Sequence, residues 1–194
     1  MFFLLTFAAI SLSVCVISLI LLHVLPTGLS PVNSFVSSYA LNRYGMLYGI
    51  QAFCSGLAAG FLAFAMVKSG LLFASSGLVA LVSYAISRLL IPFFPTDVKG
   101  QSTIKGKVHL VLAIVSFSGI AVATAHVHFI HATPAEMLFL NTFSVITIIS
   151  TLALVLTIRL NQFKAIRGLI ERGIYFGALG WIGSALVCFF SGVA

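Results

Sequence analysis

Charged residues are scarce in this chain, because Asp, Glu, Lys and Arg together make up only 7% of its 194 residues. A soluble domain has about 25% charged residues, so this composition excludes an ordinary soluble fold. Hydrophobic residues account for 61% of the chain. This length and composition predict an all-α integral membrane bundle that forms a single domain over residues 1–194.

Acidic residues are the fewest of all, with three against ten Lys and Arg, which gives a formal net charge of +7. In a soluble protein such an excess would suggest nucleic acid binding. Here the basic residues lie between apolar segments, where anionic lipid headgroups account for them better. We therefore expect membrane lipids as partners, a hydrophobic small molecule as a further ligand class, and no nucleic acid. The sequence does not identify a cofactor, a protein partner or an oligomeric state.

Cysteine is also rare, and its placement excludes a disulfide framework. Cys15, Cys54 and Cys188 all fall within apolar segments, and no two of them form a CxxC motif. We interpret them as small buried residues. The N-terminal apolar segment lacks the basic start of a secretory signal, so we expect it to be kept as the first span.

Six apolar stretches are long enough to cross a bilayer, which takes about 20 residues each. They are Phe2–Leu25, Tyr44–Val67, Gly70–Ile91, Lys107–Phe129, Ala135–Ile158 and Arg172–Ser191. After the first stretch, apolar residues repeat at helical spacing from Val32 to Ala40, with polar residues on the other face. This pattern predicts a short amphipathic helix that lies in the membrane interface.

The basic residues predict the orientation of the bundle, because Lys and Arg gather on the cytoplasmic side of membrane proteins. Only Lys68 lies on one side. The other side has Arg43, Lys99, Lys105, Lys107, Arg159, Lys164, Arg167 and Arg172. We therefore expect the second side to face the cytoplasm and, with six spans, both termini to lie outside it, in an inner (cytoplasmic) cell membrane.

Small residues form stripes along two of the spans. The stripes are Gly45, Gly49, Gly56 and Gly60 in the second span, and Gly173, Gly177, Gly180 and Ser184 in the sixth. Such stripes let a neighbouring helix approach closely. We interpret them as helix-packing surfaces rather than as walls of a ligand cleft.

The start of the fifth span has the pattern of a capped helix. Thr133 can cap the helix, Pro134 suits its first position, and Glu136 can bond back to the amide of the cap. We interpret Glu136 as structural for this reason. Further along, Ser144, Thr147 and Thr151 share one face, which predicts hydrogen bonds to neighbouring helices.

The loop after the third span has the most polar chemistry in the chain, including Thr96, Asp97 and, just beyond it, His109. Because an ionised carboxylate near hydrocarbon is costly, we expect Asp97 to pair with Arg88 or Arg172. One interpretation is structural, an ion pair that ties two helix ends together. The other is a pocket in which Asp97 orients His109 for acid–base chemistry, with Thr96 as a polar contact or weak nucleophile.

Histidines suggest two further classes of site. Near the end of the fourth span, His126, His128 and His131 lie close to Glu136, a donor set that zinc or copper could use. We interpret them instead as a polar rim, because no other span offers a further histidine at that depth, and we expect no metal. A bis-histidine haem would need His23 and His109 on facing helices, which makes haem the weaker alternative.

Three pieces of the chain form a recognisable pattern. The main piece is Phe94-Pro95-Thr96-Asp97 followed by Gly100, Thr103, Gly106, His109, Ala113 and Phe117. The others are Ser38-Tyr39 with Tyr44-Gly45, and Gly168-Leu169-Ile170-Glu171-Arg172. Together they resemble a prokaryotic multi-pass membrane family catalogued as domain of unknown function 998. An acidic residue that the family often has before the tyrosine is Ser38 here. The resemblance covers nearly the whole chain and implies a small helical membrane bundle, with no activity and no catalytic residues to assign.

All three pieces lie on the basic side, which favours a pocket that opens to the cytoplasmic leaflet. We expect this pocket to bind, or to bind and chemically modify, a lipid or other hydrophobic molecule. Its polar contacts are expected from Tyr39, Arg43, Arg88, Lys105, Lys107 and Arg172. The alternative is a non-catalytic bundle, permease-like or accessory to a partner protein. Transport is less favoured, because no broken helix or inverted repeat is evident.

Overall fold

The protein is a bundle of long helices in the computed structural model, which describes residues 1–70, 75–98, 100–127, 129, 132–160 and 165–192. The six long helices are α1 (Phe2–Val24), α2 (Gly45–Lys68), α3 (Ser75–Leu90), α4 (Ile104–His126), α5 (Pro134–Arg159) and α6 (Arg167–Phe190). Two short 3₁₀ helices, η1 (Val36–Leu41) and η2 (Ile91–Phe93), follow α1 and α3. The described part of the chain contains no strand. Six helical segments have the length and hydropathy of membrane spans, the third of them being Ser76–Phe93, which continues from α3 through η2. The predicted six-span all-α fold is therefore confirmed.

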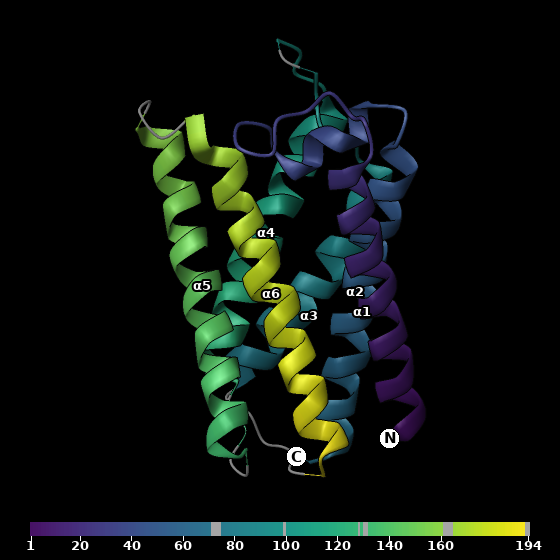
Figure 1. The fold of residues 1–194 in the computed structure, drawn as a ribbon, viewed down its shortest axis with the longest axis vertical. Coiled ribbons are helices and arrows are strands. Elements are labelled where there is room, and N and C mark those ends of the chain that lie inside the picture. The colour runs from purple at the N-terminus through teal and green to yellow at the C-terminus, as the bar shows by residue number, and fades with distance from the viewer. Residues whose placement is uncertain (71–74, 99, 128, 130–131, 161–164, 193–194) are drawn as a thin grey trace.

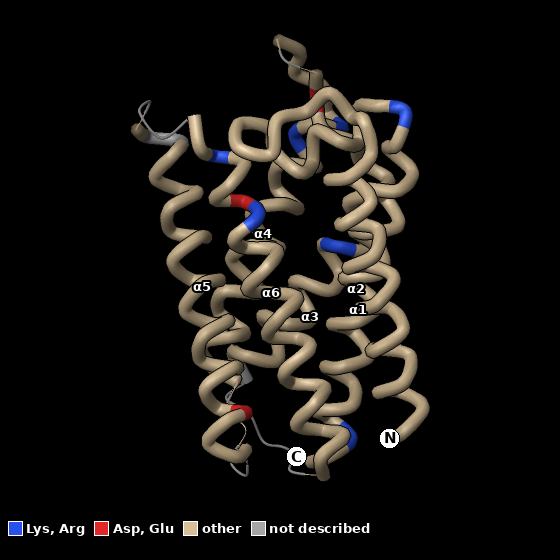
Figure 2. Tube along the Cα trace, in the orientation of Figure 1, with Lys and Arg blue, Asp and Glu red and all other residues tan. Residues whose placement is uncertain are grey.

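Both termini lie at one end of the bundle (Figure 1). Figure 2 shows that most Lys and Arg residues gather at the other end, together with η1 and the loop that follows η2. We call this the basic end. Lys68, at the last turn of α2, lies away from it. The uneven charge distribution predicted from the loops is therefore present in the folded bundle.

The helix ends follow from local sequence. Pro26 follows Leu25, whose backbone is extended as a residue before proline prefers (φ −67°, ψ 149°). Pro92 turns the end of α3 into η2. At the start of α5, Thr133 and Glu136 form the predicted capping box, so the structural interpretation of Glu136 is confirmed. Glu136 also accepts a hydrogen bond from Ser191 at 2.8 Å, which links α5 to the end of α6.

Helices α2 and α6 form the centre of the bundle, since more than half of each membrane-length segment is buried, against 11% for α5. Trp181 and Ile182 of α6 are buried in the main core with Leu62 of α2 and Leu81 of α3. The closest neighbours are α1 with α2, α2 with α3, α3 with α4, and α5 with α6. The seam between α4 and α5 is less tightly packed, and it borders the candidate site.

Most glycines of the two stripes lie close against a neighbouring segment as predicted, whereas Gly49 and Gly60 have room for a Cβ. A Cβ on Gly56 would lie 2.8 Å from the carbonyl oxygen of Ala85 on α3, and one on Gly177 would lie 2.7 Å from the backbone nitrogen of Thr147 on α5. Gly49 differs, because a Cβ there would meet only the Pro92 side chain at 3.6 Å, an ordinary contact. Gly49 also lines a groove, and helix packing alone does not require a glycine at this position.

The polar face of α5 is only partly bonded to its neighbours. Ser144 donates a hydrogen bond to the Thr124 carbonyl on α4 at 3.1 Å, as predicted. Thr147 bonds within its own helix, and the hydroxyl oxygen of Thr151 is buried without a partner. Hydroxyls in helices often bond the preceding turn, so a shared face did not ensure bonds between helices.

The amphipathic segment after α1 forms the short 3₁₀ helix η1. Val36 and Tyr39 are buried, with 0% and 1% of their surface exposed. They pack with Leu22, Tyr48 and Tyr175 of the long helices. The apolar face predicted to lie in the membrane interface therefore covers the basic end of the bundle itself.

Candidate functional site

A network of hydrogen bonds fixes the loop from Phe94 to Thr103 on the start of α4. The Asp97 carboxylate accepts hydrogen bonds from the Thr103 hydroxyl at 2.6 Å and from the Thr103 backbone N–H at 3.0 Å. The Thr103 hydroxyl in turn accepts from the backbone N–H of Gly106 and caps the helix. Asp97 lies so close to Gly106 that a Cβ there would overlap the carboxylate. The bonds from Thr103, first from its hydroxyl and then from its backbone, hold the pKa of Asp97 below its usual range.

His109 is the second attachment point of this loop. The side chain is 4% exposed, and its Nδ1 atom lies 2.7 Å from the carbonyl oxygen of Phe94. A carbonyl oxygen can only accept, so Nδ1 must carry the hydrogen. In the neutral ring Nε2 is therefore a hydrogen bond acceptor.

The predicted ion pair of Asp97 with Arg88 or Arg172 was wrong. Within the described residues Asp97 forms no ion pair with either arginine, because the Thr103 bonds already satisfy the carboxylate locally. The predicted orienting bond from Asp97 to His109 is likewise absent from the described geometry. The Phe94 carbonyl makes that contact instead.

Arg172 ties three segments together rather than pairing with Asp97. It begins the predicted sixth span but lies more than one turn inside α6. Its guanidinium donates to His23 Nε2 at 2.6 Å, to the Ser34 carbonyl at 2.9 Å and to the Tyr39 hydroxyl at 3.1 Å. It also donates to the Gly168 carbonyl within its own helix. These bonds occupy most of the donors that we expected to bind a headgroup.

The bis-histidine haem alternative does not fit this arrangement. The two ring nitrogens of His23 are both used, Nδ1 by the Leu19 carbonyl at 2.7 Å and Nε2 by Arg172. A histidine that binds haem needs a nitrogen lone pair free for the iron. In His23 the Nε2 lone pair accepts the hydrogen bond from Arg172. Of the three histidines in the metal hypothesis, His128 and His131 lie outside the described residues. His126 bonds the Val122 carbonyl of its own helix.

Glu171 is a structural anchor that the sequence analysis did not single out. The side chain is 3% exposed, and its carboxylate accepts a hydrogen bond from the backbone N–H of Val36 at 2.5 Å. This bond attaches the start of η1 to α6. The predicted sixth span begins at Arg172 and therefore left Glu171 outside, whereas α6 begins at Arg167 and includes it. A carboxylate inside an apolar span is costly without partners, and the Val36 N–H provides one.

Arg88 lies inside the bundle rather than at its edge. It is 1% exposed, and its guanidinium donates to Ser55 at 2.8 Å, to Gln51 at 2.8 Å and to Tyr175 at 3.1 Å. These partners belong to α2 and α6, so Arg88 of α3 joins three helices through neutral acceptors. Among the described residues it has no carboxylate partner within ion-pair distance.

A cavity of about 460 Å³ lies between α4, α5 and the start of α6, and we call it the α4–α5 cavity. Its walls are apolar and include Leu110, Ala113, Ile114, Phe117 and Leu154. Leu110 and Ile114 are more than half exposed, so this wall lies at the lipid-facing surface of the bundle. The polar groups that line it are Ser37, Thr96, His109, Thr157 and Arg167.

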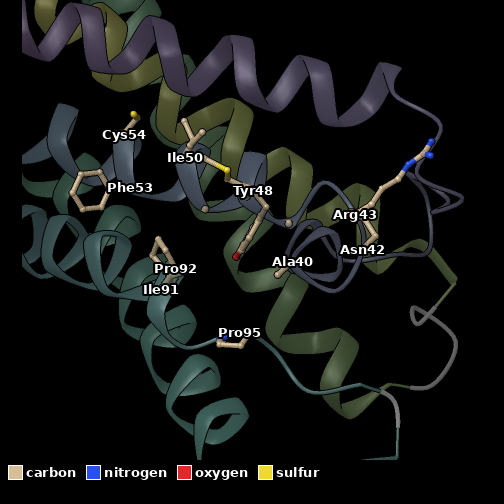
Figure 3. A pocket seen from close by; sticks show the side chains of 13 residues that line it. Ala40, Asn42, Arg43, Tyr48, Ile50, Phe53, Cys54, Ile91, Pro92 and Pro95 are labelled. Atoms are coloured by element: carbon tan, nitrogen blue, oxygen red, sulfur yellow. The ribbon is translucent and has the colours of Figure 1, made fainter.

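A second hollow of about 610 Å³ runs along the first turns of α2, and we call it the α2 groove. Its lining includes Arg43, Met46, Gly49, Phe53 and Pro92. Figure 3 shows Arg43 and Asn42 together toward one end of the groove and Phe53 toward the other.

The predicted site residues thus separate into distinct places. Thr96 and His109 line the α4–α5 cavity, and Arg43 lines the α2 groove. Tyr39 and Arg172 bond each other beneath η1. Lys105 and Lys107 are exposed on the first turn of α4 and line neither hollow. Arg167, which we had used only to orient the bundle, is the one Lys or Arg among the described residues that lines the α4–α5 cavity.

Comparison with known proteins gives one match. The family model described as "Protein of unknown function (DUF998)" matches residues 9–188 of the chain. No curated protein and no solved structure matches it.

Proposed function

The chain, which has six helices of membrane-spanning length, belongs to the DUF998 family, and we propose that it binds an anionic lipid or a similar amphiphile in the α4–α5 cavity. The observation that carries this proposal is the division of the cavity into an apolar wall and a polar end. Ligand sites typically have volumes of about 300–1,000 Å³ and mostly apolar linings with a few placed polar groups. The volume and lining of this cavity fall within that description.

Arg167 supplies the positive charge. Its guanidinium lies 4.6 Å from the centre of the Phe35 ring and donates to the Asn33 carbonyl at 3.1 Å. These contacts hold the side chain in place. Guanidinium has five N–H groups, and among the described residues only Nε of Arg167 donates a hydrogen bond, so we propose that a ligand uses the others. A phosphate or carboxylate is the partner that such a fork prefers.

His109 supplies a hydrogen bond acceptor beside this charge. With Nδ1 bonded to Phe94, the neutral ring presents Nε2 to a hydroxyl or amide group of a ligand. The same lone pair would accept a proton from a bound hydroxyl. Within the described residues no hydrogen bond joins Thr96 to His109, so Thr96 has no base to activate it as a nucleophile. We therefore propose binding as the function and do not extend it to acyl or phosphoryl transfer.

The proposal is tested by lipid binding to the purified full-length chain. Phosphatidylglycerol and phosphatidylcholine with identical acyl chains are titrated against the detergent-solubilised protein, and the complexes are counted by native mass spectrometry. We expect phosphatidylglycerol to bind more tightly and Arg167→Gln to reduce this preference about tenfold, the effect of losing roughly 1.4 kcal/mol. Ala113→Phe, which fills the apolar wall, should lower the binding of both lipids at this site.

Lys105→Gln is the matched control, because Lys105 is an exposed cation at the same end that does not line the cavity. It should leave the preference unchanged. Equal losses in Arg167→Gln and Lys105→Gln would mean a diffuse attraction of lipid to the basic end. No loss in Arg167→Gln or Ala113→Phe would overturn the proposal and favour an accessory bundle.

A further inference from the structure

The α2 groove has features of a second amphiphile site, separate from the α4–α5 cavity. Its volume is about 610 Å³. Met46, Ile50 and Phe53 of α2 and Pro92 of η2 give it an apolar body. Pro95 lines this groove whereas its neighbour Thr96 lines the α4–α5 cavity. The loop after η2 therefore takes part in the walls of both hollows.

Arg43 and Asn42, which line the groove, have hydrogen bond donors that lack an acidic or polar partner among the described residues. Arg43 is exposed, and its guanidinium lies over the Tyr44 ring at 4.7 Å. None of the three carboxylates of the chain lies within ion-pair distance of it in the described structure. Asn42 accepts a hydrogen bond from the Tyr44 N–H through Oδ1 at 2.8 Å, but its Nδ2 atom is buried without a hydrogen bond partner in the part of the chain that the structure describes. An unpaired buried amide donor is costly, so a ligand acceptor at this position would be stabilising.

The positions of the polar and apolar groups along the groove indicate which kind of ligand fits it. Arg43 and Asn42 precede the first turn of α2 at the basic end, where lipid headgroups lie. Phe53 lies eight residues into the helix, about 12 Å deeper at 1.5 Å per residue. A ligand that fits therefore has an anionic group at one end and a hydrocarbon chain along the rest. Because Met46 is 82% exposed and Phe53 is 40% exposed, the groove is open at the surface of the bundle, and a lipid could enter from the bilayer.

Packing does not explain why the groove contains Gly49. A Cβ on Gly45 would lie 2.6 Å from the Ala40 carbonyl oxygen, so Gly45 is needed for the close approach of η1. A Cβ on Gly49 would make only one ordinary contact. A larger side chain at this position would instead reduce the space inside the groove. We propose that the α2 groove binds one anionic glycerophospholipid, with its phosphate at Arg43 and Asn42 and an acyl chain along Met46, Ile50 and Phe53. This inference does not rest on the function proposed for the α4–α5 cavity.

The test is photocrosslinking of the full-length chain in nanodiscs of phosphatidylcholine. Trace amounts of phosphatidylglycerol or phosphatidylcholine with a diazirine on one acyl chain are added, and the modified residues are mapped by mass spectrometry. We expect phosphatidylglycerol to label residues 46–54 more than phosphatidylcholine does. Arg43→Gln should lower that labelling about tenfold, and Gly49→Phe should abolish it. Lys68→Gln, an exposed cation at the other end of α2, is the matched control and should change nothing.

Each result separates this site from nonspecific surface lipid. Equal labelling by the two lipids, or labelling that survives Arg43→Gln, would overturn the proposal. Because Arg43 is exposed, Arg43→Gln keeps the fold, so the charge test holds even if Gly49→Phe disturbs packing. Ala113→Phe, which blocks the α4–α5 cavity, should leave labelling of residues 46–54 intact. Its loss in Ala113→Phe would mean that the groove is not an independent site.

Discussion

The Nδ1 atom of His109 lies 2.7 Å from the carbonyl oxygen of Phe94. This contact joins the side chain of a membrane-spanning helix to the backbone of the loop that precedes it. It also fixes which nitrogen of the neutral ring carries the hydrogen, and so presents Nε2 as an acceptor. The same bond therefore has two consequences, one for the stability of the loop and one for the ligand that the cavity can take.

The two roles of His109 can be separated by substitution. Asn places an amide donor near the position of Nδ1 but has no equivalent of Nε2. We expect His109→Asn to keep most of the stability and to lose lipid binding in the α4–α5 cavity. His109→Phe should lose both, with a cost of about 1–3 kcal/mol for leaving the partly buried Phe94 carbonyl unpaired. Thermal unfolding and native mass spectrometry measure the two effects. Equal stability of the Phe and Asn variants would contradict the structural role of the bond.

Asp97 should make the stability of the protein depend on pH in the acidic range. Its pKa is lower in the folded chain because Thr103 donates two hydrogen bonds to it. A lowered pKa means that the stabilisation is complete above the usual aspartate pKa of about 3.9 and is lost as the pH falls through the folded value. We expect the melting temperatures of the parent and Asp97→Asn to differ above about pH 4 and to converge below it. Thr103→Val should show the same convergence, and a gap that stays constant with pH would disprove the assignment.

Gly56 and Gly49 lie on the same helix and should respond in opposite ways to alanine. A Cβ on Gly56 would lie 2.8–2.9 Å from backbone atoms of α3, which cannot move aside easily. We expect Gly56→Ala to destabilise the bundle by about 1–3 kcal/mol, as overpacking does. Gly49→Ala has room for its methyl group and should be neutral or stabilising by up to about 1 kcal/mol from helix propensity. Melting curves in one detergent compare the pair. Similar losses in both would show that Gly49 also packs against a helix.

The fold was predictable because its main signals are long and local. A span needs about 20 apolar residues whatever its neighbours are, and the cap at Thr133 depends on four consecutive residues. Likewise, the end of the bundle at which each basic loop lies can be predicted from the number of spans that precede the loop. These features depend little on how the helices pack.

The site was less predictable, because it depends on the identity of each neighbour. Asp97 has a local partner in Thr103, six residues away, and therefore needs no arginine. Arg88 lies in the interior because Gln51 and Ser55 provide neutral acceptors there. The rule that a charged side chain pairs with one of opposite charge does not reveal when neutral hydrogen bond partners replace the ion pair. Gly49 shows the same limit, since a stripe does not reveal which of its glycines contacts a helix.

Orientation stays a prediction from the charge count, and it has a direct test. The termini lie together at the end opposite the basic end, so both should be outside the cytoplasm if basic loops face inward. Alkaline phosphatase fused after residue 194 should be active, since it folds only outside the cytoplasm. Green fluorescent protein at the same position should be dark. The reverse pattern would place the α4–α5 cavity and the α2 groove in the outer leaflet.

Arg88 should stabilise the bundle through its bonds to α2 and α6. A charged side chain inside a membrane bundle is costly unless its donors are satisfied, and three of them are bonded to Ser55, Gln51 and Tyr175. Lys is a compact charge that cannot reproduce this fork. We expect Arg88→Lys to cost about 1.5–3 kcal/mol, the range for hydrogen bonds from charged groups. Arg43→Lys, at an exposed arginine, is the control and should cost little.

A double-mutant cycle shows whether Tyr175 shares in this cost. Tyr175→Phe removes only the hydroxyl that lies 3.1 Å from the Arg88 guanidinium. If the bond is formed, Arg88→Lys should cost less in the Tyr175→Phe background than in the parent, with a coupling of about 0.5–3 kcal/mol. Free energies of unfolding from denaturant titration of the four proteins give this value. Strict additivity would mean that the Tyr175 hydroxyl does not contribute, and that the bonded stabilisation of Arg88 comes from Ser55 and Gln51 of α2.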